Sequence, residues 1–224
     1  MKSSVVVVTY RRLARIREIL EAWQAQCDDV WLCDCSKDGA PVPQGVRVAR
    51  FAPDPGNRTR HAVALLADGD IVIKADDDIM PLPGLVHDFE RWHAHLGPCI
   101  SGVHGRTFHG KDYYNDTKMV SARHIEKPQP VDFVGVITCS SREYLSMDLR
   151  GCDTEVEDLF WHSHCYPNAP KYVIPTKAFN NKLPESRDPQ RLCADKPGRA
   201  IRRAFYTDCW LKHYAKKTRA GVGS

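Results

Sequence analysis

Short apolar runs alternate with helix-periodic segments through the first hundred residues of the chain. Val5-Val6-Val7-Val8-Thr9 is typical of a strand buried on both faces. The alternation continues with expected helices at about 11–26 and 58–67, expected strands at 29–34, 46–51 and 71–75, and a last helix that places Leu85, Phe89, Trp92 and Leu96 on one face. Strands separated by helices form βαβ units, so the sequence predicts an α/β protein with a mainly parallel central sheet flanked by helices.

The pattern changes from Cys99 onward, where glycines mark turns between polar stretches. Strands are expected near 99–103, 117–122 and 131–138, a helix at 155–164, and irregular chain at 175–197. We therefore expect a single domain over residues 1–185, with halves at about 1–98 and 99–185, followed by a basic C-terminal extension at 186–224.

The composition sets limits on the class of protein. A chain of 224 residues can bury the core of one such domain, and its apolar fraction of 42% and charged fraction of 27% are typical of soluble globular proteins. No apolar run approaches the 18 residues of a membrane span, and Val5 to Val8 is too short for a signal segment, so we expect a cytoplasmic protein. The nine cysteines follow no zinc-site spacing and are expected to be reduced and mostly buried.

Three adjacent carboxylates, Asp76-Asp77-Asp78, follow the apolar run Ile71-Val72-Ile73-Lys74-Ala75. Three such charges at the end of a buried strand repel one another and call for a compensating cation. Alternate residues of an extended segment point the same way, so Asp76 and Asp78 are expected to face one site. Two hard oxygen donors suit Mg²⁺ or Mn²⁺ completed by substrate phosphates. The alternative, a solvated acidic turn, fits poorly because apolar residues enclose the triplet on both sides.

Other polar residues follow the expected strands at the same end. Thr9 and Tyr10 end the first strand and Asp34 ends the second, as the acidic triplet ends the fourth. Ligands of parallel α/β sheets bind at the carboxyl ends of the strands. The sequence therefore predicts one crevice lined by these residues.

Several motifs, taken in order, resemble the GT-A glycosyltransferases of the family 2 type. The chain carries Val5-Val6-Val7-Val8-Thr9-Tyr10-Arg11-Arg12, then Cys33-Asp34-Cys35-Ser36-Lys37-Asp38-Gly39, where the family usually has Asp-Asp-Gly-Ser-x-Asp-Gly. It continues with Leu66-Ala67-Asp68-Gly69-Asp70-Ile71, the metal motif Asp76-Asp77-Asp78-Ile79-Met80-Pro81, and the acidic pair in Val156-Glu157-Asp158-Leu159. The resemblance covers roughly residues 5 to 165. It implies a nucleotide-sugar-dependent glycosyltransferase with a GT-A, Rossmann-like fold whose donor-binding half is about 1–98 and whose acceptor half is about 99–185.

The resemblance implies roles for the residues of the first half. Thr9 and Tyr10 would edge the base pocket, and Asp34 matches the acid that accepts the N3–H of uracil, which favours a UDP-sugar donor. Asp77 would belong to the same cofactor-binding set. Asp76 would face the ribose or the metal, and Asp78 would bind Mn²⁺ or Mg²⁺ directly. Arg58 or Arg60 would neutralise phosphate charge, although either is equally suited to the surface.

In the second half, Asp158 matches the base that deprotonates the acceptor hydroxyl, with Glu157 as the substitute. Stabilisation of a helix N-terminus is the alternative role for these charges. His162 lies one turn beyond Asp158, and it or His164 is a candidate metal ligand, although a lone histidine is more often structural. Gly135 matches the wall of the acceptor site, where glycine permits a close backbone approach.

The acceptor and the C-terminal extension leave alternatives open. Lysines and arginines between Lys196 and Arg219 are interleaved with Phe205, Tyr206, Trp210 and Tyr214. That surface would suit nucleic acid or anionic lipid, or it would be an ordinary cationic helix face. The acceptor is expected to be a hydroxyl on a glycan, a small sugar, a protein or a hydroxylated DNA base. A metal-dependent phosphohydrolase or nucleotidyltransferase is the alternative activity.

Overall fold

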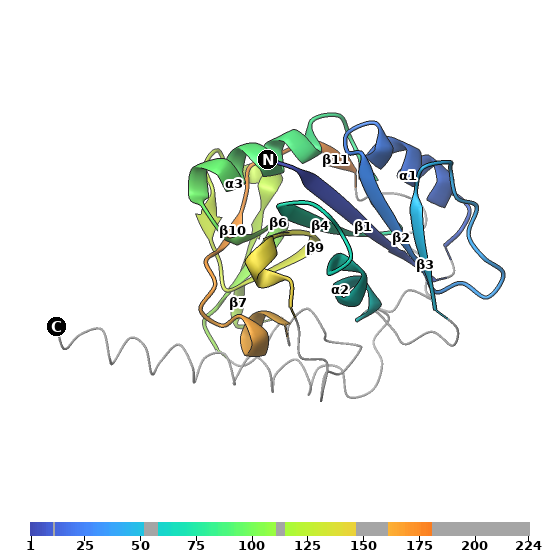
Figure 1. Cartoon of the computed structure of the whole chain (residues 1–224). Coiled ribbons are helices and arrows are strands. Elements are labelled where there is room, and N and C mark those ends of the chain that lie inside the picture. The colour runs from blue at the N-terminus through green and yellow to red at the C-terminus, as the bar shows by residue number, and fades with distance from the viewer. Residues whose placement is uncertain (11, 52–57, 111–114, 147–160, 181–224) are drawn as a thin grey trace.

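The computed structural model describes residues 1–10, 12–51, 58–110, 115–146 and 161–180 (Figure 1). Its strands are β1 (Ser3–Thr9), β2 (Asp29–Asp34), β3 (Arg47–Arg50), β4 (Ile71–Asp76), β5 (Met80–Pro81), β6 (Ile100–Phe108), β7 (Thr117–Ser121), β8 (Gln129–Pro130), β9 (Phe133–Ser141), β10 (Lys171–Val173) and β11 (Phe179–Asn180). Its helices are α1 (Ile16–Gln24), α2 (Thr59–Ala64) and α3 (Leu85–Leu96), with 3₁₀ turns at Ala122–His124 and Arg142–Tyr144 and a π-helix at Trp161–Cys165.

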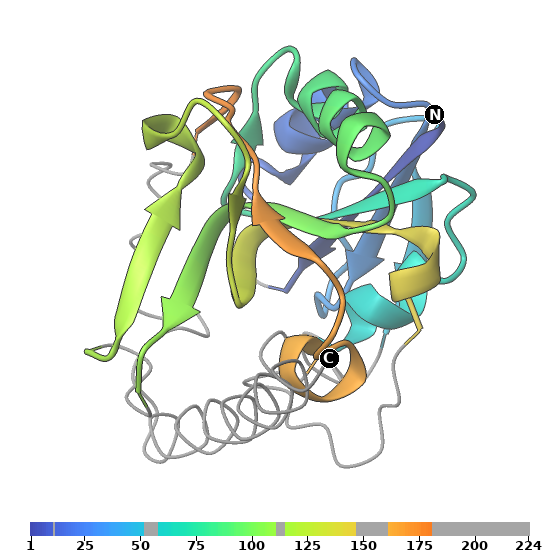
Figure 2. The same ribbon diagram turned by 90° about the vertical axis from the view of Figure 1, so that its left-hand side faces the viewer.

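A nine-stranded sheet forms the centre of the molecule, in the order β3-β2-β1-β4-β9-β6-β10-β8, with β7 paired to β6. The pairs from β3 to β4 are all parallel, which confirms the βαβ prediction for the first half. Beyond β4 the sheet is mixed, because β9 runs antiparallel to both β4 and β6. Figure 2 shows this second half, where β6 pairs with β7 and with the orange β10. A parallel pattern therefore describes only the half of the sheet that is built from helix-linked strands.

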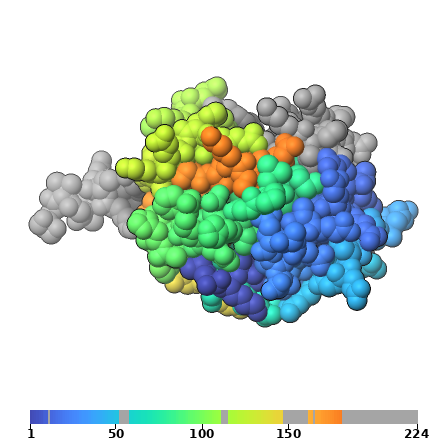
Figure 3. All heavy atoms as spheres, turned by 90° about the horizontal axis from the view of Figure 1, so that it is seen from above, coloured from blue at the N-terminus to red at the C-terminus, as the bar shows by residue number. Residues whose placement is uncertain are grey.

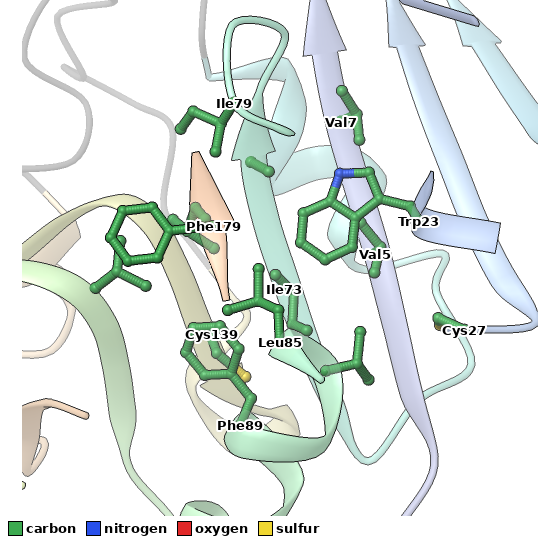
Figure 4. Packing of buried hydrophobic residues seen from close by; sticks show 14 of the residues in the cluster. Val5, Val7, Trp23, Cys27, Ile73, Ile79, Leu85, Phe89, Cys139 and Phe179 are labelled. Carbon is green, nitrogen blue, oxygen red and sulfur yellow. The ribbon is translucent and has the colours of Figure 1, made fainter. Parts of the chain in front are cut away.

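Helices cover the parallel half on both faces, with α1 and α3 on one face and α2 on the other (Figure 1). Figure 3 looks down on the first of these faces, where the blue residues of α1 lie beside the green residues of α3. In the core beneath them, Trp23 packs close to Val5 and Val7 of β1 (Figure 4). Successive β1 side chains point to opposite faces, so Val6 and Val8 join the smaller cluster under α2.

The edge of the sheet where β1 and β2 begin is fastened by buried polar contacts. The Ser4 hydroxyl donates to Asp29, and the Gly69 amide donates to Ser4 Oγ at 2.7 Å. The Asp68 amide donates to the same Asp29 carboxylate at 2.9 Å. A Cβ on Gly69 would lie 2.6 Å from backbone atoms of Ser4 and Ile71, so only glycine fits this close approach. The loop before β4 is thereby locked to β1 and β2.

Three earlier expectations concern the cysteines, membrane spans and the domain boundary. Six cysteines are described as free thiols; five of them are buried and Cys165 is half-buried. Within the described ranges, no helix is both long and apolar enough to cross a membrane. The predicted domain boundary at residue 185 and the basic extension at 186–224 lie outside the described residues.

His93 ties α3 to the sheet from a buried position. Its Nε2 lies 2.8 Å from Ser101 Oγ on β6, and its Nδ1 lies 3.2 Å from Ser141 Oγ on β9. Burial lowers the pKa of His93 to about 4, because the charged imidazolium would lose its hydration. The folded protein therefore holds this ring neutral at pH values where an unfolded chain would protonate it.

We predict that His93 makes the fold acid-sensitive. An unfolded histidine titrates near 6.5, so stability from the neutral ring is present above that pH and is lost as the pH falls toward 4. The loss between pH 7 and pH 5 is expected to be about 2 kcal/mol. Urea unfolding of the wild type and of His93→Gln at both pH values measures it, with His95→Gln on the exposed side of α3 as the control. An equal pH 7 to pH 5 difference in the wild type and in His93→Gln would contradict the prediction.

Candidate functional site

The carboxyl ends of β1, β2 and β4 meet at one edge of the sheet. Thr9 is paired with Asp34 across β1 and β2, and Val8 is paired with Asp76 across β1 and β4. The Cys35 amide donates to the Thr9 carbonyl at 2.9 Å, which holds the chain leaving β2 against the end of β1. The structure thus brings together the polar residues that the sequence placed at three separate strand ends.

Asp77 is fixed by donors from the end of β1. Thr9 Oγ1 donates to Asp77 Oδ2 at 2.8 Å, the Tyr10 amide donates to the same carboxylate, and Arg12 Nη1 lies 3.1 Å from Oδ1. Burial raises the pKa of Asp77 to about 6, and the neighbouring Asp78 adds to the rise, although Thr9 and Arg12 oppose it. Asp77 is therefore the member of the triplet that fastens β4 to β1.

Arg12 bridges two carboxylates of the triplet with one nitrogen. Its Nη1 lies 3.1 Å from Asp77 and 2.8 Å from Asp78 Oδ2, and its side chain is only 15% exposed. Burial would lower the pKa of Arg12, but the charges of Asp77, Asp78 and Asp76 outweigh burial and raise it. A guanidinium of this chain thus supplies part of the compensating positive charge that the triplet needs.

Arg60 supplies a second cation to the triplet. Its Nη1 lies 2.9 Å from Asp76 Oδ1, and its side chain is 7% exposed whereas that of Asp76 is 42% exposed. Arg58 is the N-cap residue of α2, two positions earlier, and is half-buried. Of the two arginines that the sequence left equal, the structure ties Arg60 to the acidic motif.

The strand that carries the triplet ends at Asp76, and Asp77 and Asp78 lie in a turn. The alternation that predicted Asp76 and Asp78 on one side therefore does not extend past the first of them. Their carboxylates remain hard oxygen donors of the kind that Mg²⁺ and Mn²⁺ take together with phosphate oxygens and water. Among the described residues, no group of three or more His, Cys, Asp or Glu side chains is arranged to hold a metal ion. The chemistry of the two carboxylates, Asp76 and Asp78, thus suits such an ion, and both carboxylates pair with arginines.

Asp34 is buried and organises the loop that follows β2. Its Oδ1 accepts hydrogen bonds from the Ser36 amide and hydroxyl, and its Oδ2 accepts one from the Ala40 amide at 3.0 Å. Burial would raise the pKa of Asp34, but these donors and the charge of Arg50 lower it below its ordinary value. Asp34 is thus held ionised, and its buried carboxylate faces three hydrogen-bond donors and the guanidinium of Arg50.

His162 lies in the core, within the π-helix. Its Nε2 donates to the Val134 carbonyl at 2.9 Å, and its ring contacts those of Phe133 and Trp161 at centroid distances of 4.9 and 4.7 Å. Its Nε2 is committed to the backbone of β9, so a metal would have to approach the other ring nitrogen. The side chain of His164 and the whole of Glu157 and Asp158 lie outside the described residues.

Lys74 is buried in β4, two residues before Asp76. Its Nζ lies 3.3 Å from the centroid of the Trp161 ring and 3.4 Å from His61 Nδ1 on α2. A desolvated ammonium over an indole face is a strong form of the cation–π contact. This contact fixes the start of the π-helix against the strand that leads into the acidic triplet. The chain segment with Glu157 and Asp158 therefore ends at an anchored tryptophan.

The predicted acceptor-side wall contains an unusual backbone conformation. A Cβ on Gly135 would come within 3.1 Å of the Phe133 ring, and Val136 has a φ of 72°. Left-handed backbone is rare for a β-branched residue and costs conformational energy. It lies where the pairing of β6 with β9 shifts register between Gly102 and His104. The irregularity thus lies in β9, on the half of the domain expected to hold the acceptor.

Sequence reasoning missed Arg12 and Lys74 as members of this arrangement. Arg12 was visible only as part of a basic stretch, and its contact with Asp78 spans more than sixty positions. Lys74 gave a stronger signal, because a lysine in the middle of an otherwise apolar, buried strand requires a specific partner. Nothing in the sequence pattern names that partner, which proves to be Trp161.

We predict that the Thr9 hydroxyl stabilises the fold through Asp77. Thr9→Val keeps the shape of the side chain but removes a donor from a buried carboxylate, which is expected to cost about 1–3 kcal/mol. Thr9→Ser retains the hydroxyl and is expected to cost less. Urea unfolding in EDTA at pH 7.5 compares the three proteins. A Thr9→Val protein as stable as the wild type would contradict the prediction, and a loss confined to Thr9→Ser would show that the methyl group, not the hydrogen bond, carries the effect.

No protein-family model matches the chain, and no curated protein matches it either. Among solved structures, the fold is similar to that of TarS from S. aureus. TarS 1-349 in complex with UDP-GlcNAc gives a TM-score of 0.56 at 18% identity, over 80% of this chain and 57% of TarS 1-349. TarS 1-349 in complex with UDP gives 0.55 at the same identity, over 80% of this chain and 59% of that one.

A longer TarS structure matches over 80% of this chain but only 36% of its own length, with a TM-score of 0.54. The chain thus spans a little over half of TarS 1-349 and about a third of the longer form. The likeness confirms the predicted fold class, an α/β domain of the GT-A type with a central sheet flanked by helices.

Proposed function

We propose that the chain is a glycosyltransferase that moves a sugar from a nucleotide-sugar donor to a hydroxyl acceptor. The observation that carries the proposal is the meeting of Thr9, Asp34 and the acidic triplet at one sheet edge. This edge belongs to a fold shared with TarS, whose structure has been solved with UDP-GlcNAc bound. In parallel α/β sheets ligands bind at that edge, so the donor site is assigned there.

A uridine nucleotide is the donor that this edge fits best. Asp34 is held ionised, which is the state in which a carboxylate accepts the N3–H of uracil, and Thr9 and Tyr10 lie beside it at the end of β1. The Thr9 hydroxyl donates its hydrogen bond to Asp77, so Thr9 would form the floor of the base pocket. We therefore propose a UDP-sugar as the donor.

The diphosphate of the donor would lie over the acidic triplet. Asp76 and Asp78 would hold Mn²⁺ or Mg²⁺, which when bound neutralises the charge that develops on the departing diphosphate. Arg60, next to Asp76, adds positive charge at the same place. His162 remains a candidate ligand only through Nδ1, because its Nε2 donates to Val134.

The acceptor hydroxyl would lose its proton to Asp158, with Glu157 as the substitute. The acceptor oxygen would then attack the anomeric carbon while the bond from that carbon to the diphosphate breaks. The contact between Lys74 and Trp161 supports this role, because it anchors the chain three residues beyond Asp158 to the strand that carries the triplet. A catalytic base on this segment would thus be held at a defined position relative to the phosphates of the donor.

The acceptor would be a glycan or a hydroxylated base in DNA, the latter engaged by the basic extension at 186–224. A phosphohydrolase or nucleotidyltransferase would use the same carboxylates. The products separate these activities, since transfer from UDP-GlcNAc releases UDP together with a glycosylated acceptor. A phosphohydrolase would instead release inorganic phosphate or UMP.

We predict metal-dependent binding of UDP. Calorimetric titration of UDP with Mn²⁺ present is expected to give a Kd in the micromolar range, and EDTA or Asp78→Ala is expected to weaken it by at least about tenfold. Asp34→Asn is expected to weaken UDP more than ADP, because its effect acts through the base. Asp28→Ala, an exposed carboxylate at the opposite edge of the sheet, is the control. No binding of any nucleotide or nucleotide-sugar would remove the transferase proposal and favour the phosphohydrolase.

We predict that Asp158→Asn abolishes transfer without abolishing donor binding. Loss of a general base is expected to slow the reaction by about 10²–10⁴-fold, whereas the Kd of UDP should change little. UDP release from UDP-GlcNAc, measured with oligosaccharides and with hydroxymethylated DNA as acceptors, follows the rate. Glu157→Gln is the matched variant. If it eliminates the activity while Asp158→Asn retains it, the base is Glu157.

A further inference from the structure

Arg12 pairs with Asp78, the carboxylate that the proposed function assigns to the metal ion. Its Nη1 forms an ion pair with Asp78 Oδ2 at 2.8 Å and donates a hydrogen bond to Asp77 Oδ1 at 3.1 Å. All three side chains are largely shielded from water, with exposures of 15%, 17% and 9% for Arg12, Asp78 and Asp77. Without a ligand, the positive charge at Asp78 therefore comes from the protein itself.

A divalent ion on Asp78 and the guanidinium of Arg12 are poorly compatible in this geometry. The ion would bring two further positive charges within a few ångströms of Arg12, where limited access of water leaves their repulsion weakly screened. A nucleotide diphosphate changes this balance, because its oxygens can take both the metal and the guanidinium. Arginine matches phosphate with paired N–H donors, so the transfer exchanges one charge-assisted contact for another.

We propose that Arg12 is an internal counterion that stands in for the metal at Asp78 and makes binding of the divalent ion depend on binding of the nucleotide diphosphate. The inference rests on the proposed function, because it concerns how binding of the metal ion and binding of the nucleotide diphosphate are linked at the proposed donor site. Arg12 acts as a positioning residue: in the empty site it pairs with Asp77 and Asp78, and in the loaded site it pairs with the phosphates.

The contacts of Asp77 allow Arg12 to leave without loosening the fold. Asp77 also accepts hydrogen bonds from Thr9 Oγ1 at 2.8 Å and from the Tyr10 amide, and these tie β4 to β1 independently of Arg12. Arg60 is different, because its side chain is more deeply buried and its contact is with Asp76 at the end of the strand. Arg12 lies between β1 and α1, outside any regular element, so a change in its side-chain contacts alters no backbone hydrogen bond of a helix or strand.

The test measures Mn²⁺ binding by electron paramagnetic resonance, without nucleotide and with saturating UDP, in the full-length wild type and in Arg12→Gln. Removal of the competing cation is expected to tighten nucleotide-free Mn²⁺ binding by about tenfold. The factor by which UDP improves Mn²⁺ affinity should fall by a similar amount, because the variant lacks the guanidinium that UDP would otherwise draw away from Asp78. Arg15→Gln, at an arginine paired with Glu18 rather than with the triplet, is the control and should leave both quantities unchanged.

Arg12→Gln leaves three carboxylates with less compensation, so its folding is checked by thermal unfolding. If it does not fold, Arg12→Gln/Asp77→Asn restores the charge balance and keeps an acceptor for Thr9, and it is compared with Asp77→Asn alone. Within that pair too, loss of Arg12 should tighten nucleotide-free Mn²⁺ binding. A merely structural role for Arg12 would weaken binding in either variant, never tighten it.

The outcomes separate this inference from the proposed function. If UDP and Mn²⁺ bind the wild type together but loss of Arg12 leaves nucleotide-free Mn²⁺ affinity unchanged or weaker, the inference is overturned and the transferase proposal stands. If the wild type binds no UDP at all, the proposed function fails, and the inference that rests on it fails with it. Tighter nucleotide-free Mn²⁺ binding in Arg12→Gln, together with a smaller effect of UDP on Mn²⁺ affinity, supports both the inference and the proposed function.

Discussion

The architecture depends on β1 being buried on both faces and paired on both edges. Val5 and Val7 face the core under α1 and α3, Val6 and Val8 face the core under α2, and parallel ladders join the strand to β2 and β4. Four consecutive valines satisfy this position because neither face tolerates a polar side chain. With β1 fixed, the ends of the neighbouring strands are fixed as well, so Thr9, Asp34 and Asp76 meet at one end of the sheet.

The sequence was sufficient to predict the parts of the fold that repeat a local pattern. Apolar runs such as Ile71–Ala75 and the helical spacing of Leu85, Phe89 and Leu96 predicted β4 and α3, and strand polarity placed Thr9 and Asp34 at one edge. The position of β9, antiparallel between β4 and β6, was not predictable. Nothing in the local sequence of β9 indicates which strands it pairs with or in which direction it runs. The two-residue strands β5 and β11 were missed for the same reason, since they exist only through their pairing with each other.

The residues of the candidate site likewise fall into a group that the sequence could place and a group that it could not. Residues that follow a strand could be placed from the sequence, whereas their partners could not. The acidic triplet predicted a compensating cation, and the pattern favoured a metal; the structure adds Arg12 and Arg60 from two distant segments. Lys74 and Trp161 form a contact between segments almost ninety positions apart, which periodicity cannot reveal. Asp158 and Glu157 remain predictions, since they lie outside the described residues.

The polar contacts at the two ends of the parallel strands differ in kind. Where β1 and β2 begin, the Asp29 carboxylate accepts hydrogen bonds from the Ser4 hydroxyl and the Asp68 amide, and the Gly69 amide donates to Ser4 Oγ. Where the strands end, the Thr9 hydroxyl and the Tyr10 amide donate to Asp77, and two guanidinium groups also contact the triplet. Charge is therefore unevenly distributed along the parallel strands, with three carboxylates and two guanidinium groups gathered at the end where Thr9 and Asp34 also lie.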